Sequence, residues 1–129
     1  MRGRSCCIRH EHVHAHDQSR TRNPLGGTMI VINAKITADQ ATVAALAEAI
    51  GKMERASLEE PGCSEYCFSV EVSNPGVFRI TERWNSVEDL KAHFATPHMA
   101  EFQAAMAANP SQGTEIHCYE AEEIPFPAM

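Results

Sequence analysis

The sequence lacks an apolar run that approaches the roughly 20 residues of a membrane-spanning helix. Its first residues are basic and histidine-rich, without the apolar segment of a secretory signal. A glycine-rich nucleotide-binding motif is also missing, although seven Gly are present. These absences argue against a membrane protein, a secreted protein and a nucleotide-binding fold.

The five cysteines do not form a metal-binding or redox pattern. Cys63 and Cys67 are separated by three residues, whereas zinc ribbons and thiol–disulfide sites use the CxxC spacing. Cys63, Cys67 and Cys118 also lack the neighbours that mark a reactive thiolate. We therefore expect reduced thiols and a cytoplasmic protein.

The 129 residues are enough for one folded domain and too few for a second of ordinary size. The net charge of −6 is unevenly distributed. Residues 1–28 hold five Arg against two acidic residues, which gives +3, and the remaining chain therefore carries −9. An acidic folded part argues against nucleic acid as a partner.

Residues 1–28 predict a disordered His/Arg-rich tail, because they have almost no apolar periodicity and end in a Pro/Gly breaker cluster. The tail carries an imidazole at every second position, at His10, His12, His14 and His16. Such a row could hold a divalent metal, although it has no rigid supporting shell, and an unstructured tail is the simpler interpretation. Residues 29–122 form the predicted domain, and residues 123–129 a short extended tail.

The hydrophobic periodicity predicts an α+β domain with the order β-α-β-β-α-β, in which the second helical part is split in two. The expected strands are 29–36, 64–72, 78–84 and 114–122. The first helix should open with the capping-box sequence Thr37-Ala38-Asp39-Gln40 and end at the breaker sequence Glu59-Glu60-Pro61-Gly62. The second should follow the N-cap Ser86 and present Val87, Leu90 and Phe94 as its apolar row, and a third should follow Pro97. This order is typical of a ferredoxin-like fold, a four-stranded antiparallel sheet with its helices on one face. Because apolar residues occur on both strand faces, we expect a homodimer in which a second copy covers the other face.

Several short motifs in this order resemble the antibiotic-biosynthesis monooxygenase superfamily, and its bacterial quinol monooxygenase branch in particular. The motifs are Ala34-Lys35-Ile36, Glu60-Pro61-Gly62-Cys63 with Tyr66, Glu82-Arg83-Trp84, Ala92-His93 and Thr96-Pro97-His98-Met99. The resemblance implies a dimeric α/β barrel built from two ferredoxin-like subunits. It also implies oxidation of quinols or similar electron-rich aromatics by O2, with no metal, flavin or other cofactor.

Cofactor-free oxygenation requires a base that deprotonates the substrate, and His93 is the first candidate because imidazole titrates near neutral pH. His98, at the start of the last helix, is the second candidate. Each His also has a purely structural interpretation, as a helix-terminal or capping residue. The catalytic prediction is therefore His93 and His98, with no metal ligand.

Four further residues predict a substrate pocket on the sheet. Trp84 offers a flat wall for an aromatic ring, and Glu82 shares its strand face. Tyr66 and Phe68 could line the same cavity. A packed core is the simpler interpretation of all four, and a buried Glu82 would need an Arg or backbone donor, or a proton. A non-catalytic ligand-binding or dimerisation module on the same fold therefore remains the alternative function.

Deletion of residues 1–28 should leave the melting temperature and any activity nearly unchanged, because this segment offers no core residues. Thermal unfolding and activity assays of the full and shortened chains test this. A shortened chain that fails to fold, or activity that is lost with it, would show that the tail and its histidine row belong to the functional unit.

Overall fold

The computed structural model describes residues 27–128, so the predicted tail and its histidine row lie almost entirely outside the described residues. The described chain forms four antiparallel strands and three helices, in the predicted order. These elements are β1 (Met29–Thr37), α2 (Gln40–Leu58), β2 (Cys63–Glu71), β3 (Asn74–Trp84), α3 (Val87–Phe94), α4 (Pro97–Ala108) and β4 (Gly113–Ala121). The predicted ferredoxin-like α+β fold is confirmed.

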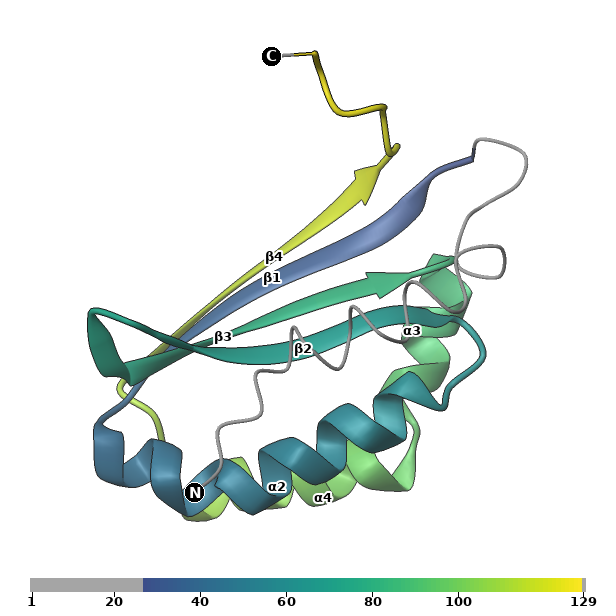
Figure 1. The fold of residues 1–129 in the computed structure, drawn as a ribbon. Helices are drawn as coiled ribbons and strands as arrows, with labels where there is room; N and C mark the ends of the chain where they lie inside the picture. The colour runs from purple at the N-terminus through teal and green to yellow at the C-terminus, as the bar shows by residue number, and fades with distance from the viewer. Residues whose placement is uncertain (1–26, 129) are drawn as a thin grey trace.

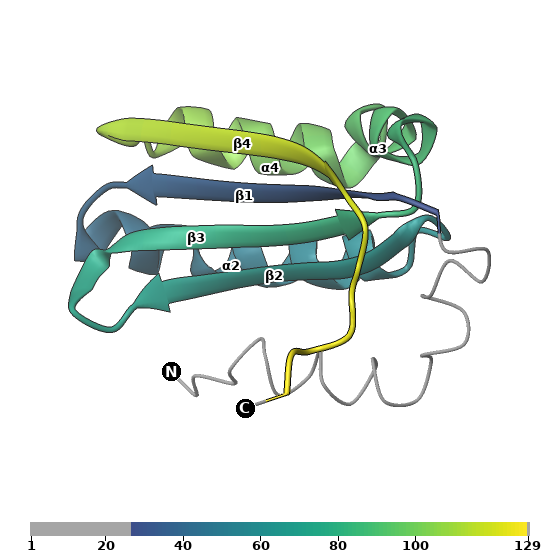
Figure 2. The ribbon, with the colours of Figure 1, turned by 90° about the horizontal axis from the view of Figure 1, so that it is seen from above.

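The strands are arranged in the order β2-β3-β1-β4, and α2, α3 and α4 lie on one face of this sheet (Figures 1 and 2). In the register between β1 and β3, Ile32 faces Glu82 and Ile30 faces Trp84. In the register between β2 and β3, Tyr66 also faces Glu82. The fold therefore places the predicted site residues of two strands side by side on the helix-covered face.

The helices start where side chains satisfy their first backbone N–H groups. Ser86 is the N-cap of α3, as predicted, and its hydroxyl accepts from the Asp89 amide at 3.1 Å. For α2 the predicted capping box is wrong: Thr37 is the last residue of β1, and Asp39 caps the helix by accepting from the Thr42 amide at 2.7 Å.

Helix α3 presents a different row to the sheet from the predicted one. Leu90 is buried as expected, but Val87 and Phe94 are 42% and 56% exposed. The side chain that packs inward beside Leu90 is His93, which is fully buried. An imidazole therefore takes a position where the core would normally place an apolar residue.

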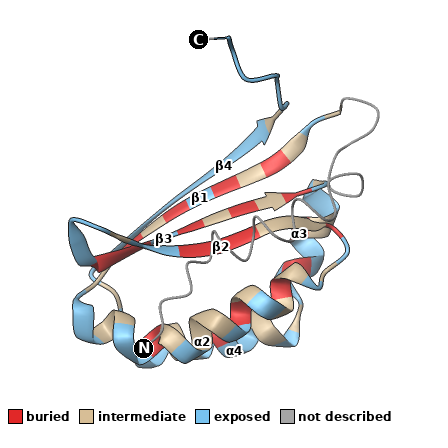
Figure 3. Cartoon of the chain, in the orientation of Figure 1, coloured by how far each residue is buried: buried red, intermediate tan, exposed pale blue. Residues whose placement is uncertain are grey.

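Burial is concentrated on β1, β2, β3 and the facing sides of the helices, whereas β4 is exposed along nearly its whole length (Figure 3). Ile116 and Tyr119, on opposite faces of β4, are 64% and 50% exposed. On the helix-free face of β2 and β3, ion pairs join Arg79 to Glu71 and Arg83 to Glu65. The sheet-to-sheet homodimer stays a prediction, and this second face is more polar than that prediction assumed.

The opposite edge of the sheet is partly closed by a helix. The backbone N–H of Phe68, in edge strand β2, donates to the Glu54 carboxylate of α2 at 2.7 Å. An unpaired N–H at a sheet edge is a template for another strand, and a carboxylate there occupies it.

Gly62 allows the turn between α2 and β2 to approach α3 closely. A Cβ at this position would overlap the Asp89 side chain in the first turn of α3. The Asn85 amide also donates to the Gly62 carbonyl at 2.8 Å, which fastens the turn to the beginning of α3. Any side chain at position 62 therefore forces Asp89 or the adjoining backbone to shift.

Gly62→Ala should therefore lower stability by about 1–3 kcal/mol, the usual cost of overpacking. The matched control is Gly113→Ala, because a Cβ at Gly113 meets nothing within 4 Å. Thermal or denaturant unfolding measures both variants. Equal stability of the two variants would contradict the close approach of Gly62 and Asp89.

Candidate functional site

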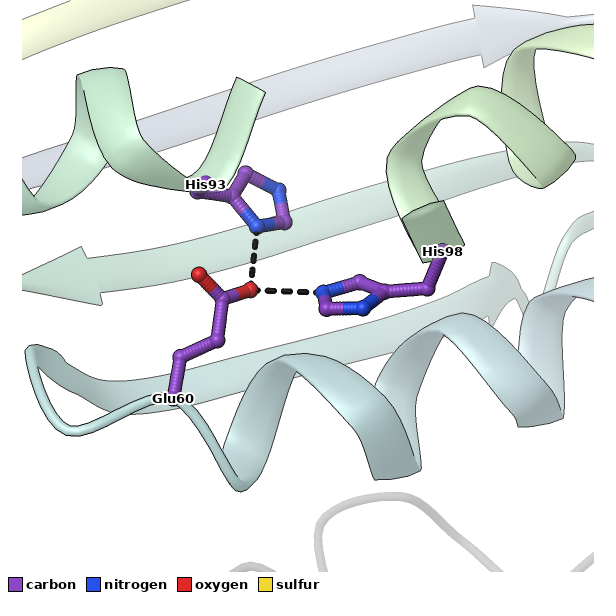
Figure 4. A group of neighbouring side chains, drawn as sticks. All are labelled: Glu60, His93 and His98. Atoms are coloured by element: carbon purple, nitrogen blue, oxygen red, sulfur yellow. Dashed lines mark hydrogen bonds and ion pairs between the residues drawn. The ribbon is translucent and has the colours of Figure 1, made fainter. Parts of the chain in front are cut away.

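One carboxylate and two imidazoles meet at the end of the sheet where α2, α3 and α4 converge (Figure 4). Glu60 Oε2 lies 2.6 Å from His93 Nδ1 and 2.7 Å from His98 Nε2. The His93 side chain is fully buried, and those of Glu60 and His98 are only 14% and 17% exposed. A single oxygen atom therefore links both predicted catalytic residues.

The junction between α3 and α4 holds the two imidazoles in place. Thr96 is the N-cap of α4: its hydroxyl donates to the His93 carbonyl at 2.7 Å and accepts from the Met99 amide at 3.3 Å. Pro97 occupies the first turn of α4, where the missing N–H costs nothing. The last turn of α3 and the first turn of α4 are thus joined through one side chain, with His93 before it and His98 after it.

Glu60 is held by the turn that connects α2 to β2. Its amide donates to the Ser57 carbonyl at 3.0 Å, and its carbonyl accepts from the Cys63 amide at 3.1 Å. Two residues later, Gly62 brings this turn into close contact with the beginning of α3. The carboxylate is therefore presented to the two imidazoles by a backbone that is fixed on both sides.

The hydrogen bonds determine which ring atom of His93 carries a lone pair. An ionised carboxylate only accepts, so Nδ1 of His93 donates to Glu60 and the lone pair lies on Nε2. This Nε2 atom is buried and has no hydrogen-bond partner among the described residues. Burial lowers the pKa of His93, while the bond to Glu60 and its charge raise it and the neighbouring His98 lowers it. The neutral form with a desolvated basic nitrogen is favoured.

Aromatic rings surround this imidazole. The ring centroid of Trp84 lies 4.5 Å from that of His93, and that of Tyr66 lies 5.5 Å away. Tyr66 also packs edge-on against Trp84 at 6.4 Å and against Phe68 at 5.6 Å. These rings give His93 an apolar environment with a low dielectric constant, in which its charge state strongly affects the energy of the site.

Glu82 is a second buried carboxyl next to the aromatic cluster. Its Oε1 accepts from Trp84 Nε1 at 2.8 Å, so the predicted Arg or backbone donor is wrong and an indole takes that place. The pKa of Glu82 is raised to about 7, mainly by burial; the bond from the indole lowers it and the charge of Glu60 raises it. The group therefore changes charge near neutral pH.

A surface hollow of about 370 Å³ opens between α2 and α4 and reaches His98. Met53 and Phe102 contribute its large apolar side chains, and Lys52 pairs with Glu101 at 2.9 Å on its rim. His98 is thus the member of the Glu60 cluster that also faces this hollow.

The sequence profile of the antibiotic biosynthesis monooxygenase family matches residues 29–105, which include the whole Glu60 cluster. The chain belongs to this family. No match was found among curated proteins.

Solved structures of the antibiotic biosynthesis monooxygenase family share the fold. A candidate monooxygenase of this family from Deinococcus radiodurans is 26% identical, with a TM-score of 0.70 over 78% of this chain and 99% of its own. A Bacteroides thetaiotaomicron protein described as a possible oxidoreductase is 25% identical, with a TM-score of 0.67 over 74% and 99% of the two chains. A Caulobacter crescentus family candidate, 23% identical over 85% and 100%, has a TM-score of 0.68 and supports the fold alone. Family membership and the first two of these likenesses support an oxidoreductase of the monooxygenase type.

The structure brings the predicted site residues together, with differences in accessibility. His93, Trp84, Tyr66 and Phe68 form one contiguous cluster on the helix-covered face, and Glu82 is bonded to Trp84. His98 joins them through its bond to Glu60 and through its ring, whose centroid lies 5.8 Å from that of His93. Trp84 is 0% exposed, so its observed contacts are those of a core residue, and its role as a substrate wall stays a prediction.

None of the described helices is long and apolar enough to cross a membrane.

Sequence reasoning missed Glu60 as a functional residue. It was assigned to the breaker sequence that ends α2, although it opens one of the motifs that carry the family resemblance. Two histidines that need an acceptor, and an acidic residue inside a shared motif, were signals that could have identified it. Burial raises the pKa of the Cys63 thiol, in the same motif, and so disfavours the nucleophilic thiolate.

Replacing Glu82 by Gln should remove a pH-dependent loss of stability. Its pKa is about 7 in the folded protein and 4.5 as the ordinary value, so the folded state binds the proton more tightly. Stability is therefore greatest below the ordinary pKa and is lost as pH rises through the folded one. This loss is on the order of 3 kcal/mol.

Thermal unfolding between about pH 5 and pH 8 tests this prediction. As pH rises, the melting temperature of the original protein should fall relative to that of Glu82→Gln. The exposed Glu120→Gln is the control and should follow the original protein. Parallel curves for all three proteins would rule out a buried carboxyl that ionises near neutral pH.

Proposed function

We propose that this protein oxidises a quinol or related electron-rich aromatic with O2, without a bound cofactor, and that His93 is the base. The observation that carries the proposal is the bond between Glu60 Oε2 and His93 Nδ1, which leaves a buried, unpartnered lone pair on Nε2. A carboxylate that orients an imidazole and stabilises its protonated form is a recurring arrangement for general bases. Family membership supports the reaction type at the coarser level.

The proposed chemistry begins with transfer of a substrate hydroxyl proton to His93 Nε2. The resulting quinolate is electron-rich enough to donate an electron to O2. One oxygen atom then enters the ring and the other leaves as water, so that a quinol and O2 yield a hydroxyquinone and H2O. All four electrons that reduce O2 come from the substrate, and no external reductant is needed.

The residues around His93 have distinct roles in this proposal. Glu60 stabilises the imidazolium that forms, and it connects His93 to His98, through which the proton can pass toward the α2–α4 hollow. Trp84 and Tyr66, and Phe68 beside them, provide aromatic faces for the substrate ring. Glu82, bonded to the Trp84 indole, fixes the orientation of that ring.

Oxygen uptake with menadiol and EDTA-treated protein tests the proposal. We expect uptake above the autoxidation blank, and a decrease in kcat of at least about 100-fold for His93→Ala, the lower end of what a general base contributes. His117→Gln is the matched control, since this histidine is 59% exposed and lies on β4. The melting temperature of each variant shows whether the fold is retained.

The outcomes separate the alternatives. No uptake above the blank with several quinols would overturn the enzyme proposal and favour a non-catalytic ligand-binding module. Uptake that survives in His93→Ala but not in His98→Ala would contradict His93 as the base and assign that role to the imidazole that faces the hollow. Loss of oxygen uptake in Glu60→Gln, with uptake by His117→Gln unchanged, supports the role of the carboxylate–imidazole pair.

A further inference from the structure

We infer that Glu60, His93 and His98 form a binding site for a divalent transition-metal ion of the Zn²⁺ type. Each residue offers one ligand atom, and the three atoms lie within 4.8 Å of one another. Two imidazole nitrogens and one carboxylate oxygen are the ligand set of many zinc sites, in which water completes the tetrahedron. Imidazole nitrogens favour Zn²⁺ and its first-row neighbours over Mg²⁺ or Ca²⁺, which prefer oxygen ligands.

The geometry of the imidazoles is already close to that of a metal site. The bonded nitrogens of both rings point toward Glu60 Oε2, at 2.6 and 2.7 Å (Figure 4). A zinc–nitrogen bond is about 2.0–2.1 Å, so an ion near the present position of Oε2 needs each ring to move by only about half an ångström. The Glu60 oxygen has to move back by about one zinc–oxygen bond length to become the third ligand. A flexible side chain permits this, while the rings stay packed.

The charge around the cluster favours a cation. Glu60 is largely buried, and the groups that bond its carboxylate among the described residues are the two imidazoles, with no Lys or Arg. A second buried carboxyl, Glu82, is close enough for the charges of the two groups to interact. Burying a carboxylate is costly unless a cation or several donors compensate it, and a divalent ion does so more completely than two imidazole N–H donors.

The backbone supports the three ligands and leaves a way in. Thr96 links the turn that carries His93 to the turn that carries His98, and the α2–β2 turn holds Glu60. Such preorganisation lowers the entropic cost of assembling a metal site. His98 also lines the α2–α4 hollow, so an ion and its water ligand can reach the site from that side.

A bound metal and the proposed base exclude each other. A metal on His93 Nδ1 takes the lone pair of that atom, so the ring proton has to move to Nε2. The Nε2 atom then donates and can no longer accept a substrate proton. This part of the inference rests on the proposed function, and it makes Zn²⁺ an inhibitor of oxygen uptake rather than its cofactor.

Metal binding is tested on the full chain, in which His10, His12, His14 and His16 are replaced by Asn so that the tail cannot compete for the ion. The chelator-treated protein is titrated with Co²⁺, whose visible d–d absorption reports coordination, and the bound Co²⁺ is then displaced with Zn²⁺. We expect one ion per chain. Glu60→Gln and His98→Gln in this background should each weaken binding by about 10-fold or more, and His117→Gln should not.

The result that overturns the site is the absence of Co²⁺ absorption at stoichiometric concentration, or binding that Glu60→Gln and His98→Gln leave unchanged while melting temperatures confirm their fold. Oxygen uptake supplies the second measurement. Zn²⁺ should inhibit it over the concentration range in which it binds, and EDTA should restore it. Binding without inhibition would contradict the mutual exclusion, and a protein without uptake still gives a decisive Co²⁺ titration.

Discussion

The site depends on one oxygen atom, Oε2 of Glu60, which accepts from two imidazoles that come from different helices. This atom determines the tautomer of His93 and joins the buried end of the cluster to the partly exposed His98. Without it, the two imidazoles would lie next to each other with these nitrogens unpaired, at a cost of about 1–3 kcal/mol for each lost bond. The arrangement of α3, α4 and the α2–β2 turn can be understood as the frame that keeps this carboxylate in reach.

The charge of the cluster and the aromatic core are coupled. Trp84 contacts His93 through its ring and donates its N–H to Glu82, so one buried indole lies between two titratable groups. In a low-dielectric interior, a change of charge on either group is transmitted to the other more strongly than in water. The same packing that stabilises the fold therefore also tunes the chemistry of the imidazole.

Most of the fold could be predicted from the sequence, because strand alternation and helix periodicity are local signals. Burial of Glu82 followed from its place between Ile80 and Trp84 on one strand face. Its indole partner lies two residues away on that face, whereas the prediction considered only Arg and backbone groups as donors. Glu60 could not be predicted from periodicity, because its role arises only when residues 33 and 38 positions further along the chain fold back onto it.

The two edges of the sheet have unequal chemistry. At β2, the Glu54 carboxylate occupies an outward backbone N–H, whereas β4 is exposed along nearly its whole length. Growth of the sheet by an added strand is thus directional: it meets a competing acceptor on one side and open backbone on the other. An added strand, whether from another molecule or from the C-terminal segment, would therefore pair more readily with β4 than with β2.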